Sequence, residues 1–136
     1  MDEIAETGRR VEKGCIMDVK VYLSGKITGE PNYKEYFKEA ENLAKRAIPR
    51  ISSLFETLHV SVAVLNPAVL PLGMSERDYM RIAMAMLDCS DYILMLDNWE
   101  DSEGAKVEKL YAEKVGTKVL YCAALRKLQQ GNKERE

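Results

Sequence analysis

The chain is poor in the residues that several common catalytic sites require. Its 136 residues include one histidine, His59, which precedes a predicted strand and has no nucleophile paired with it, so a Ser-His-Asp arrangement is excluded. The three cysteines are odd in number and show no C-x-x-C spacing: Cys15, Cys89 and Cys122. This pattern indicates reduced thiols and argues against a metal site. We expect no metal and no cofactor.

Long apolar runs and an excess of basic charge are also missing. No apolar run approaches the roughly 20 residues that cross a bilayer, and the first residues lack the basic-then-apolar order of a signal peptide. The formal net charge is −2, and basic and aromatic residues do not cluster as a nucleic-acid surface requires. We therefore expect a cytoplasmic protein that binds neither a membrane nor polymeric nucleic acid.

What the chain does contain is an alternation of strand and helix patterns. Runs rich in β-branched and apolar residues predict strands at 19–23, 60–65, 91–96 and 118–122. Apolar residues at helical spacing predict helices at about 33–48, 76–89 and 102–115, the last stopped by Gly116. Such alternation is typical of parallel βαβ units. The predicted fold is a single-domain α/β, Rossmann-like (flavodoxin-like) three-layer sandwich with a mainly parallel sheet of four to five strands.

The two ends of the chain differ in composition from this domain. Residues 1–17 are polar and aperiodic, and we expect a mobile N-terminal extension. Residues 18–125 form the predicted domain, and 126–136 form a charged tail, frayed or helical. The helix near 76–89 is rich in Met and Ala and is apolar on more than one face. Either the helix is buried against the sheet and another layer, or it forms a subunit interface, and we expect a homodimer.

One carboxylate is predicted on an inward helix face. In a helix that starts near residue 102, Glu108 shares a face with small or apolar positions: Gly104, Tyr111, Ala112 and Val115. No lysine or arginine lies four residues away from it. A carboxylate in such a place is costly unless it is hydrogen-bonded or used in chemistry. Two interpretations stay open: Glu108 sits at the edge of the face and reaches solvent, or it is a functional acid.

Two loops follow predicted strands and carry polar groups. The turn at 24–29 holds Lys26, two hydroxyls and two glycines, which is a weak anion-binding signal. The loop at 97–103 is rich in carboxylates and includes Trp99, which either stacks on a planar base or covers the rim of the core. Loops at the carboxyl ends of parallel strands are where ligands bind. If the two strands are neighbours, both loops face one crevice.

Residues 22–29, 66–68 and 99–105, with Glu108, resemble the DUF4406 family over about residues 18–122. That family is similar to the nucleoside 2-deoxyribosyltransferase superfamily, which includes the 2'-deoxynucleoside 5'-phosphate N-hydrolases. The resemblance implies cleavage of an N-glycosidic bond in a nucleoside or nucleoside 5'-monophosphate. It also implies that Glu108 attacks C1' of the sugar, with Tyr22 near both. The implied phosphate-binding residues are Ser24, Gly25, Lys26, Ile27, Thr28, Gly29 and Ser102. Asp97, Trp99 and Gly104 are further candidate binding residues, because they lie in the loop after the third predicted strand and at the start of the helix that follows.

The chain departs from this resemblance at one position. Active members usually carry an aspartate eight residues before the acidic residue that opens the third strand. Counting back from Asp91 gives Ala83. That aspartate assists the leaving group, and loss of a general acid typically costs roughly 10²–10⁴ in rate. Three functions therefore stay open: an N-glycosidic-bond enzyme, a nucleotide-binding or sensing module without turnover, and a self-associating scaffold.

Overall fold

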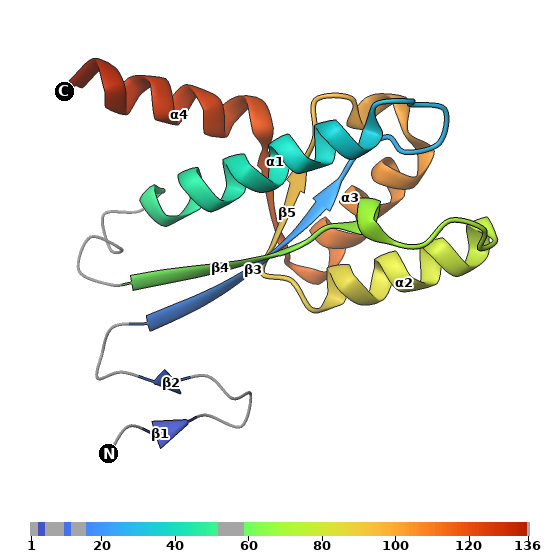
Figure 1. Cartoon of the computed structure of the whole chain (residues 1–136), viewed down its shortest axis with the longest axis horizontal. Helices are drawn as coiled ribbons and strands as arrows, with labels where there is room; N and C mark the ends of the chain where they lie inside the picture. The colour runs from blue at the N-terminus through green and yellow to red at the C-terminus, as the bar shows by residue number, and fades with distance from the viewer. Residues whose placement is uncertain (1–2, 5–9, 12–15, 52–58, 136) are drawn as a thin grey trace.

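A four-stranded, all-parallel sheet forms the middle of the molecule (Figure 1). The computed structural model describes residues 3–4, 10–11, 16–51 and 59–135. The strands are β3 (Ile16–Ser24), β4 (His59–Leu65), β5 (Tyr92–Met95) and β6 (Lys118–Tyr121), in the spatial order β4-β3-β5-β6. This confirms the predicted α/β class and is consistent with a Rossmann-like, flavodoxin-like sandwich. The central strand β3 pairs with β4 on one side and with β5 on the other.

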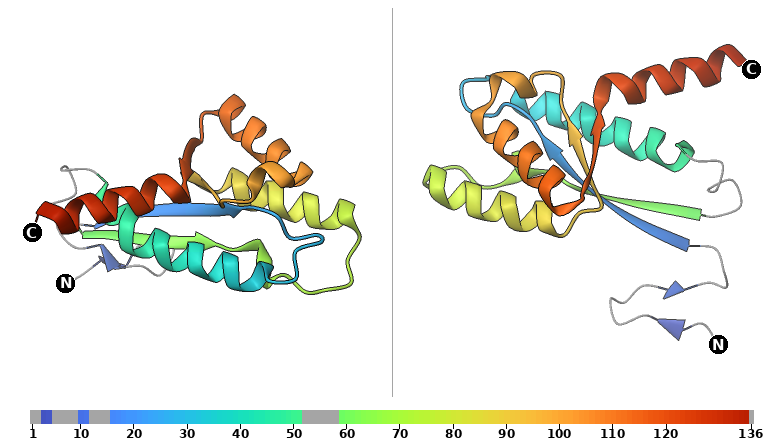
Figure 2. Two further views of the ribbon diagram at one scale, coloured as in Figure 1. Left: turned by 90° about the horizontal axis from the view of Figure 1, so that it is seen from above. Right: turned by 180° about the vertical axis from the view of Figure 1, so that it is seen from behind.

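Two helices cover each face of the sheet (Figure 2). On one side, α1 (Tyr33–Ala47) and α4 (Cys122–Arg135) pack on Val21 and Leu23. On the other side, α2 (Glu76–Asp88) and α3 (Glu103–Val115) pack on Tyr22 and Ile93. Side chains of a strand alternate between the two faces of a sheet. Tyr22 and Ser24 therefore both point toward the layer of α2 and α3.

Local capping chemistry fixes where two of these helices begin. The Ser75 hydroxyl accepts a hydrogen bond from the backbone N–H of Asp78, and the Ser102 hydroxyl accepts one from that of Ala105. Gly116 caps the C-terminus of α3, and its φ of 84° is the left-handed conformation that favours glycine. Short 3-10 turns complete the connections: η1 (Ile48–Arg50), η3 (Pro67–Val69) and η4 (Trp99–Asp101).

The chain ends depart from the expected boundaries. The fourth strand ends at Tyr121, one residue earlier than predicted, because Cys122 already opens α4. Helix α4 packs on α1 through Leu125, which is buried. At the other end, β1 (Glu3–Ile4) and β2 (Arg10–Val11) pair antiparallel, while residues 1–2, 5–9 and 12–15 of the expected extension lie outside the described residues. In the part of the chain that the structure describes, no helix combines the length and apolar character needed to span a bilayer.

Candidate active site

The side chain of Glu108 lies inside the protein and is held by two hydroxyl groups. It is 6% exposed. The Tyr22 hydroxyl donates a hydrogen bond to Oε2 at 2.6 Å, and the Ser24 hydroxyl donates one to Oε1 at 2.6 Å. Hydrogen bonds to an ionised carboxylate are among the short and strong ones. Of the two interpretations of Glu108, the edge position open to solvent is therefore wrong.

The predicted inward face of α3 is shorter than its sequence spacing indicated. Its buried residues are Ala105, Glu108 and Ala112. Val115 was expected on this face, but it is 53% exposed. It is the last residue of α3 and directly precedes the turn at Gly116. The inward face therefore ends at Ala112, and Glu108 is the one charged residue among the buried residues of this helix.

Burial and hydrogen bonding act on Glu108 in opposite directions. Removal from water raises the pKa of Glu108, and the hydrogen bonds from Ser24 and Tyr22 partly oppose this. The pKa of Tyr22 is raised well above its ordinary value, first by burial and then by the neighbouring carboxylate. Tyr22 consequently stays protonated and remains a donor. The site is a carboxylate with neutral donors and no cation bonded to it among the described residues.

The sheet register explains how these residues meet. Tyr22 and Ser24 are two positions apart on β3, so both side chains reach the face that α3 covers. Ser24 is the last residue of β3 and pairs with Met95 at the end of β5. The loop after β5 leads through η4 into α3 and sets Glu108 against the two hydroxyls. The first and third predicted strands are neighbours, which was the condition for both loops to lie at one edge of the sheet.

The turn after β3 is fastened to the loop after β5. A Cβ atom on Gly25 would lie 2.8 Å from Leu96 Cβ, so only glycine fits there without a shift. The backbone N–H of Lys26 donates to Asn98 Oδ1 at 3.0 Å. Gly29 has a φ of 79°, which again favours glycine. Sequence reasoning did not single out Asn98, although its place directly after a strand was a usable signal.

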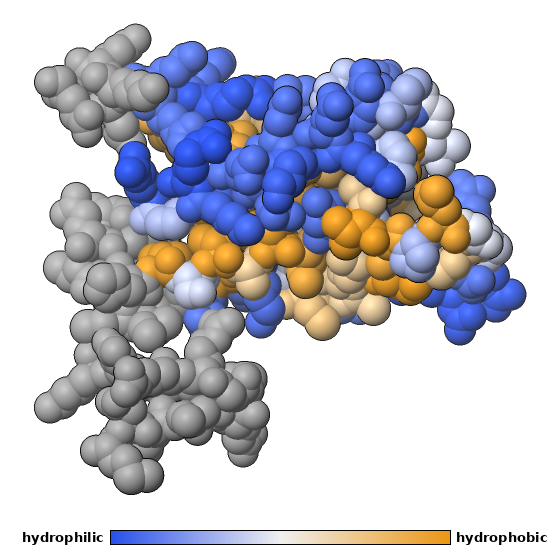
Figure 3. All heavy atoms as spheres, in the orientation of Figure 1, coloured by the Kyte–Doolittle hydropathy of each residue, from blue (hydrophilic) through white to orange (hydrophobic). Residues whose placement is uncertain are grey.

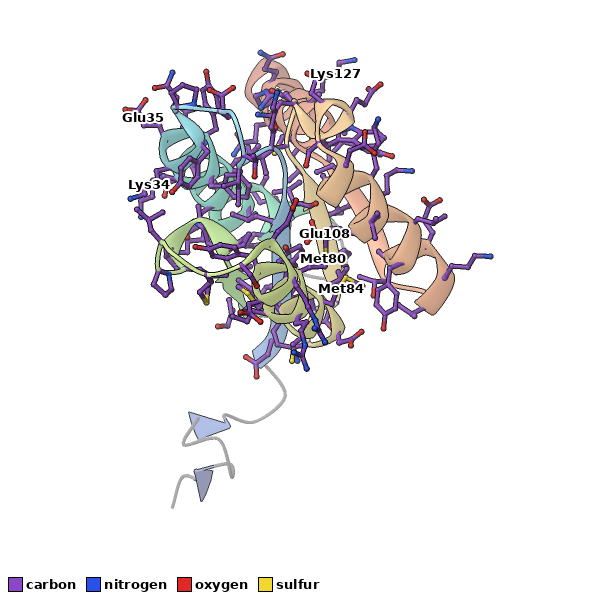
Figure 4. The ribbon with its side chains drawn as sticks, turned by 90° about the vertical axis from the view of Figure 1, so that its right-hand side faces the viewer. Lys34, Glu35, Met80, Met84, Glu108 and Lys127 are labelled. Atoms are coloured by element: carbon purple, nitrogen blue, oxygen red, sulfur yellow. The ribbon has the colours of Figure 1, made fainter. Side chains whose placement is uncertain are left out.

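Helix α2 supplies an apolar wall next to Glu108. Figure 4 shows Met80 and Met84 of α2 on the same side of the molecule as Glu108. Met84 packs on the cluster that contains Tyr22 and Ala105, and Ala83, 8% exposed, belongs to that cluster. The Met80 methyl carbon lies 3.7 Å from where a Cβ of Gly104 would be. Sequence reasoning assigned these methionines to the core or to an interface and missed that Met80 lies against Gly104, one turn from Glu108.

Three of the candidate binding residues contact parts of the protein other than Glu108. Ser102 caps α3 with its hydroxyl. The Trp99 ring lies 6.2 Å from that of Tyr121, centroid to centroid, packs against the core and carries Lys109 Nζ at 5.3 Å. Both carboxylate oxygens of Asp97 accept hydrogen bonds from Arg126, at 2.6 and 2.7 Å. The structure thus brings Tyr22 and Ser24 onto Glu108, and gives Trp99 and Asp97 other partners.

Comparison with known proteins assigns the chain to a family. Residues 19–121 match the family described as Domain of unknown function (DUF4406). The chain belongs to the DUF4406 family. No curated protein and no solved structure matches it. The matched segment of this DUF4406 domain contains Tyr22, Ser24 and Glu108, and it ends where α4 begins.

The DUF4406 domain also has a groove of about 660 Å³ on the opposite side of the loop after β5. Its lining includes Leu43 and Arg46 of α1, the loop residues Asp97 and Asn98, and Arg126 of α4. Glu108, Tyr22 and Ser24 do not line it. In the described part of the chain, no group of three or more His, Cys, Asp or Glu side chains is arranged to hold a metal ion. Asn98 therefore lines the groove and also holds the turn after β3 through the backbone N–H of Lys26.

Proposed function

We propose that this DUF4406 protein is an enzyme that cleaves the N-glycosidic bond of nucleosides or nucleoside 5'-monophosphates. The observation that carries the proposal is the buried carboxylate of Glu108 at the carboxyl edge of the sheet, hydrogen-bonded to Tyr22 and Ser24. A desolvated carboxylate without a cationic partner is costly to keep in a fold. Such groups concentrate at functional sites, and the resemblance to nucleoside 2-deoxyribosyltransferases points to the same residue.

In the proposed reaction, Glu108 is the nucleophile. One carboxylate oxygen attacks C1' of the sugar, and the C1'–N bond breaks through an oxocarbenium-like transition state. Water or a second base then takes the sugar from Glu108 and restores the carboxylate. Tyr22 and Ser24 are positioning residues in this scheme, because their hydrogen bonds fix both carboxylate oxygens.

The phosphate of a nucleoside 5'-monophosphate is proposed to lie between the turn at 24–29 and the start of α3. Lys26 offers positive charge, and the N-terminus of α3 begins at Ser102 with backbone N–H groups that favour anions. The fastening of Gly25 and Lys26 to the loop after β5 supports this placement, because it holds the turn beside the start of η4.

The direct test is release of free base. A panel of nucleosides and 5'-monophosphates is incubated with the protein, and the base is quantified by chromatography. We expect release from at least one substrate, and Glu108→Ala to abolish it. Glu113→Ala is the matched control, because Glu113 lies on the same helix but is exposed and paired with Lys109. The absence of base from every substrate at high enzyme concentration would reject the proposal.

A second candidate function is a nucleotide-binding module without turnover. The observation that favours it is Ala83, which stands where active members of the related superfamily usually carry an aspartate and is packed in the core. This candidate predicts calorimetric binding of a nucleotide with no base released. Lys26→Ala would weaken that binding and Glu108→Gln would leave it nearly unchanged.

We also propose that the protein is a homodimer that uses the outer surface of α2 and β4. Apolar side chains gather there in Figure 3, and they include Leu65, Ile82, Ala85 and Met86. Such a patch is typical of an interaction surface. Light scattering should give twice the chain mass, and Ala85→Glu should give the mass of one chain. A monomer at high concentration would reject the proposal.

We propose a cytoplasmic location because the described cysteines are free thiols. Cys89 is exposed and Cys122 is buried, and neither forms a disulfide. Burial raises the pKa of Cys122 to about 12, so its thiol is unreactive. Free thiols persist in reducing compartments. Cellular fractionation would test this directly.

A further inference from the structure

The buried part of α2 carries no acid, because the acidic residues of this helix, Glu76, Asp78 and Asp88, all have exposed side chains. On its inward side, α2 carries Met80, which lies 3.7 Å from where a Cβ of Gly104 would be, and Ala83 and Met84, which pack with Tyr22 and Ala105. Gly104 is one turn before Glu108 on the same face of α3. Neutral purines and pyrimidines are poor leaving groups, and a general acid that protonates them is typically worth roughly 10²–10⁴ in rate. A site with a nucleophile and an apolar wall therefore suits a different kind of leaving group.

We propose that the substrates of this site are N-glycosides of a positively charged heterocycle, such as an N7-alkylated purine or a pyridinium nucleoside. This inference rests on the proposed function and specifies its substrate class. Such a heterocycle already carries the positive charge that protonation would supply. It leaves as a neutral molecule, so the site needs no acid.

Two carboxylates at the end of α2 and in the loop after β5 are engaged elsewhere. Asp88, at the end of α2, accepts a hydrogen bond from the Tyr111 hydroxyl at 2.5 Å. Asp97 is paired with Arg126 on the groove side of the loop. The pKa of Glu108 is raised by burial and lowered by the hydrogen bonds from Ser24 and Tyr22. Asp88 and Asp97 are therefore engaged away from Glu108. The other acids of α2 and of this loop have exposed side chains: Glu76, Asp78, Glu100, Asp101 and Glu103.

The one histidine also lies far from the site. In the register of β3 and β4, Tyr22 pairs with Leu65, whereas His59 pairs with Ile16 at the other end of the same ladder. Six strand residues correspond to about 20 Å. His59 is therefore at the opposite edge of the sheet from the hydroxyls that hold Glu108.

Charge and polarizability favour a cationic ring here. Glu108 carries a buried negative charge, and its hydrogen-bond partners are two neutral hydroxyls. A cationic heterocycle beside C1' would supply the missing opposite charge in a site of low dielectric, where it counts most. Methionine side chains are flexible and polarizable and pack well on aromatic rings. Met80 and Met84 can therefore contact the ring without offering it a proton.

The chemical steps balance without an enzyme acid. A Glu108 oxygen forms a bond to C1' as the C1'–N bond breaks, and the electron pair of that bond neutralises the heterocycle. Water then bonds to C1', the bond to Glu108 breaks, and the proton of the water passes to solvent. The sum is cationic N-glycoside plus water giving sugar, neutral heterocycle and one proton.

The test compares 7-methylguanosine with guanosine, and each as its 5'-monophosphate, because the paired substrates differ by one methyl group and its charge. Release of base is measured by chromatography with the uncatalysed rate subtracted, and Glu108→Gln is the inactive control. We expect release from the methylated member at least 100-fold faster than from the neutral one. Similar rates for both would overturn this inference while supporting the proposed function. No release from either would also overturn this inference, whereas the proposed function is rejected only if the whole substrate panel releases no base.

A variant that installs an acid tests the same point in the opposite direction. Ala83→Asp should raise the cleavage of guanosine by 10-fold or more and leave 7-methylguanosine within about threefold of wild type. Ala83→Asn is the matched control, because it has nearly the same shape and no acidic proton. If both Ala83 variants fail to fold, Met80→Glu places a carboxyl group on the same wall at a less buried position. A folded acid variant that speeds neither substrate would contradict the inference.

Discussion

The Ser24 hydroxyl lies 2.6 Å from Oε1 of Glu108, although 84 positions separate the two residues in the chain. Ser24 ends the central strand, and Glu108 is on the second turn of α3. With the Tyr22 hydroxyl on Oε2, the contact occupies both oxygens of the carboxylate. The two hydrogen bonds therefore hold the Glu108 side chain in one orientation. They also stabilise its negative charge inside the protein.

The first prediction concerns the stability of the fold as pH changes. Burial raises the pKa of Glu108 above the ordinary value of 4.5, so the folded state binds its proton more tightly than the unfolded chain does. The free energy of unfolding should then fall as pH rises from about 4.5 through the raised pKa, and level off above it. Glu108→Gln removes this titration. The melting temperature of Glu108→Gln should exceed that of wild type by an amount that grows across this window.

The matched control for this measurement is Glu113→Gln. Glu113 is exposed and forms an ion pair with Lys109 at 2.9 Å. Exposed ion pairs contribute about 1 kcal/mol or less, so this variant should melt within a few degrees of wild type throughout. A constant difference between Glu108→Gln and wild type from pH 4 to pH 8 would contradict the burial argument.

The second prediction concerns the pH dependence of turnover in Tyr22→Phe. A nucleophilic carboxylate must be ionised, so base release should rise with pH through the pKa of Glu108, above the usual range of glutamate. Phenylalanine removes one of the two hydrogen bonds that lower this pKa. The acidic limb should therefore move to higher pH, with turnover at neutral pH about 10-fold lower. Rates measured from pH 4 to pH 9 give both quantities.

Tyr111→Phe is the control for Tyr22→Phe. The Tyr111 hydroxyl also bonds a carboxylate, that of Asp88, but the pair is exposed and lies at the far end of α2. Loss of this hydroxyl should leave the acidic limb in place. Equal shifts in the two variants would show that Tyr22 does not act through Glu108.

The sequence predicted the sheet and the inward helix face of Glu108, for a physical reason, but it left open whether the carboxylate reaches solvent. Strand periodicity puts Tyr22 and Ser24 on one face, and helix periodicity puts Glu108 one turn beyond Gly104 on an inward face. Both periods are local and are visible in the chain. The contact between the two hydroxyls and the carboxylate depends on β3 and β5 being neighbours, which the alternation of strands and helices indicated but did not fix.

The side-chain contacts between elements far apart in the chain could not be predicted from these local periodicities. Asp97 and Trp99 were predicted as ligand contacts because they follow a strand. Their partners, Arg126 and Tyr121, come from the last helix and the last strand. Met80 and Met84 looked like core or interface residues because apolar spacing does not reveal which neighbour a side chain meets. These contacts depend on the packing of elements far apart in the chain.

The third prediction compares two glycines near the site. A Cβ on Gly25 would approach Leu96 Cβ to 2.8 Å, so Gly25→Ala should destabilise the fold by about 1–3 kcal/mol. A Cβ on Gly104 would meet Met80 at 3.7 Å, an ordinary contact in a helix where alanine is favoured by up to about 1 kcal/mol. Gly104→Ala should therefore keep or raise stability. Urea unfolding measures both, and equal effects would contradict the close approach of the two loops.

The fourth prediction separates the proposed phosphate side of the site from the groove on the other face. Lys26 belongs to the turn after β3, whereas Arg126 is paired with Asp97 and lines the groove. Charge-assisted hydrogen bonds contribute about 1.5–3 kcal/mol. Lys26→Gln should therefore raise KM for a nucleoside 5'-monophosphate about 10-fold or more and leave KM for the matching nucleoside within about twofold. Arg126→Gln should change neither by more than about twofold.

The comparison of the two substrates makes this prediction specific. A variant that merely loosened the turn would raise KM for nucleoside and monophosphate alike, because both need the sugar placed at Glu108. Loss of a phosphate contact affects the monophosphate alone. If Arg126→Gln instead raises KM for the monophosphate selectively, the phosphate binds in the groove on the α1 and α4 face, and the role given to the turn at 24–29 is wrong.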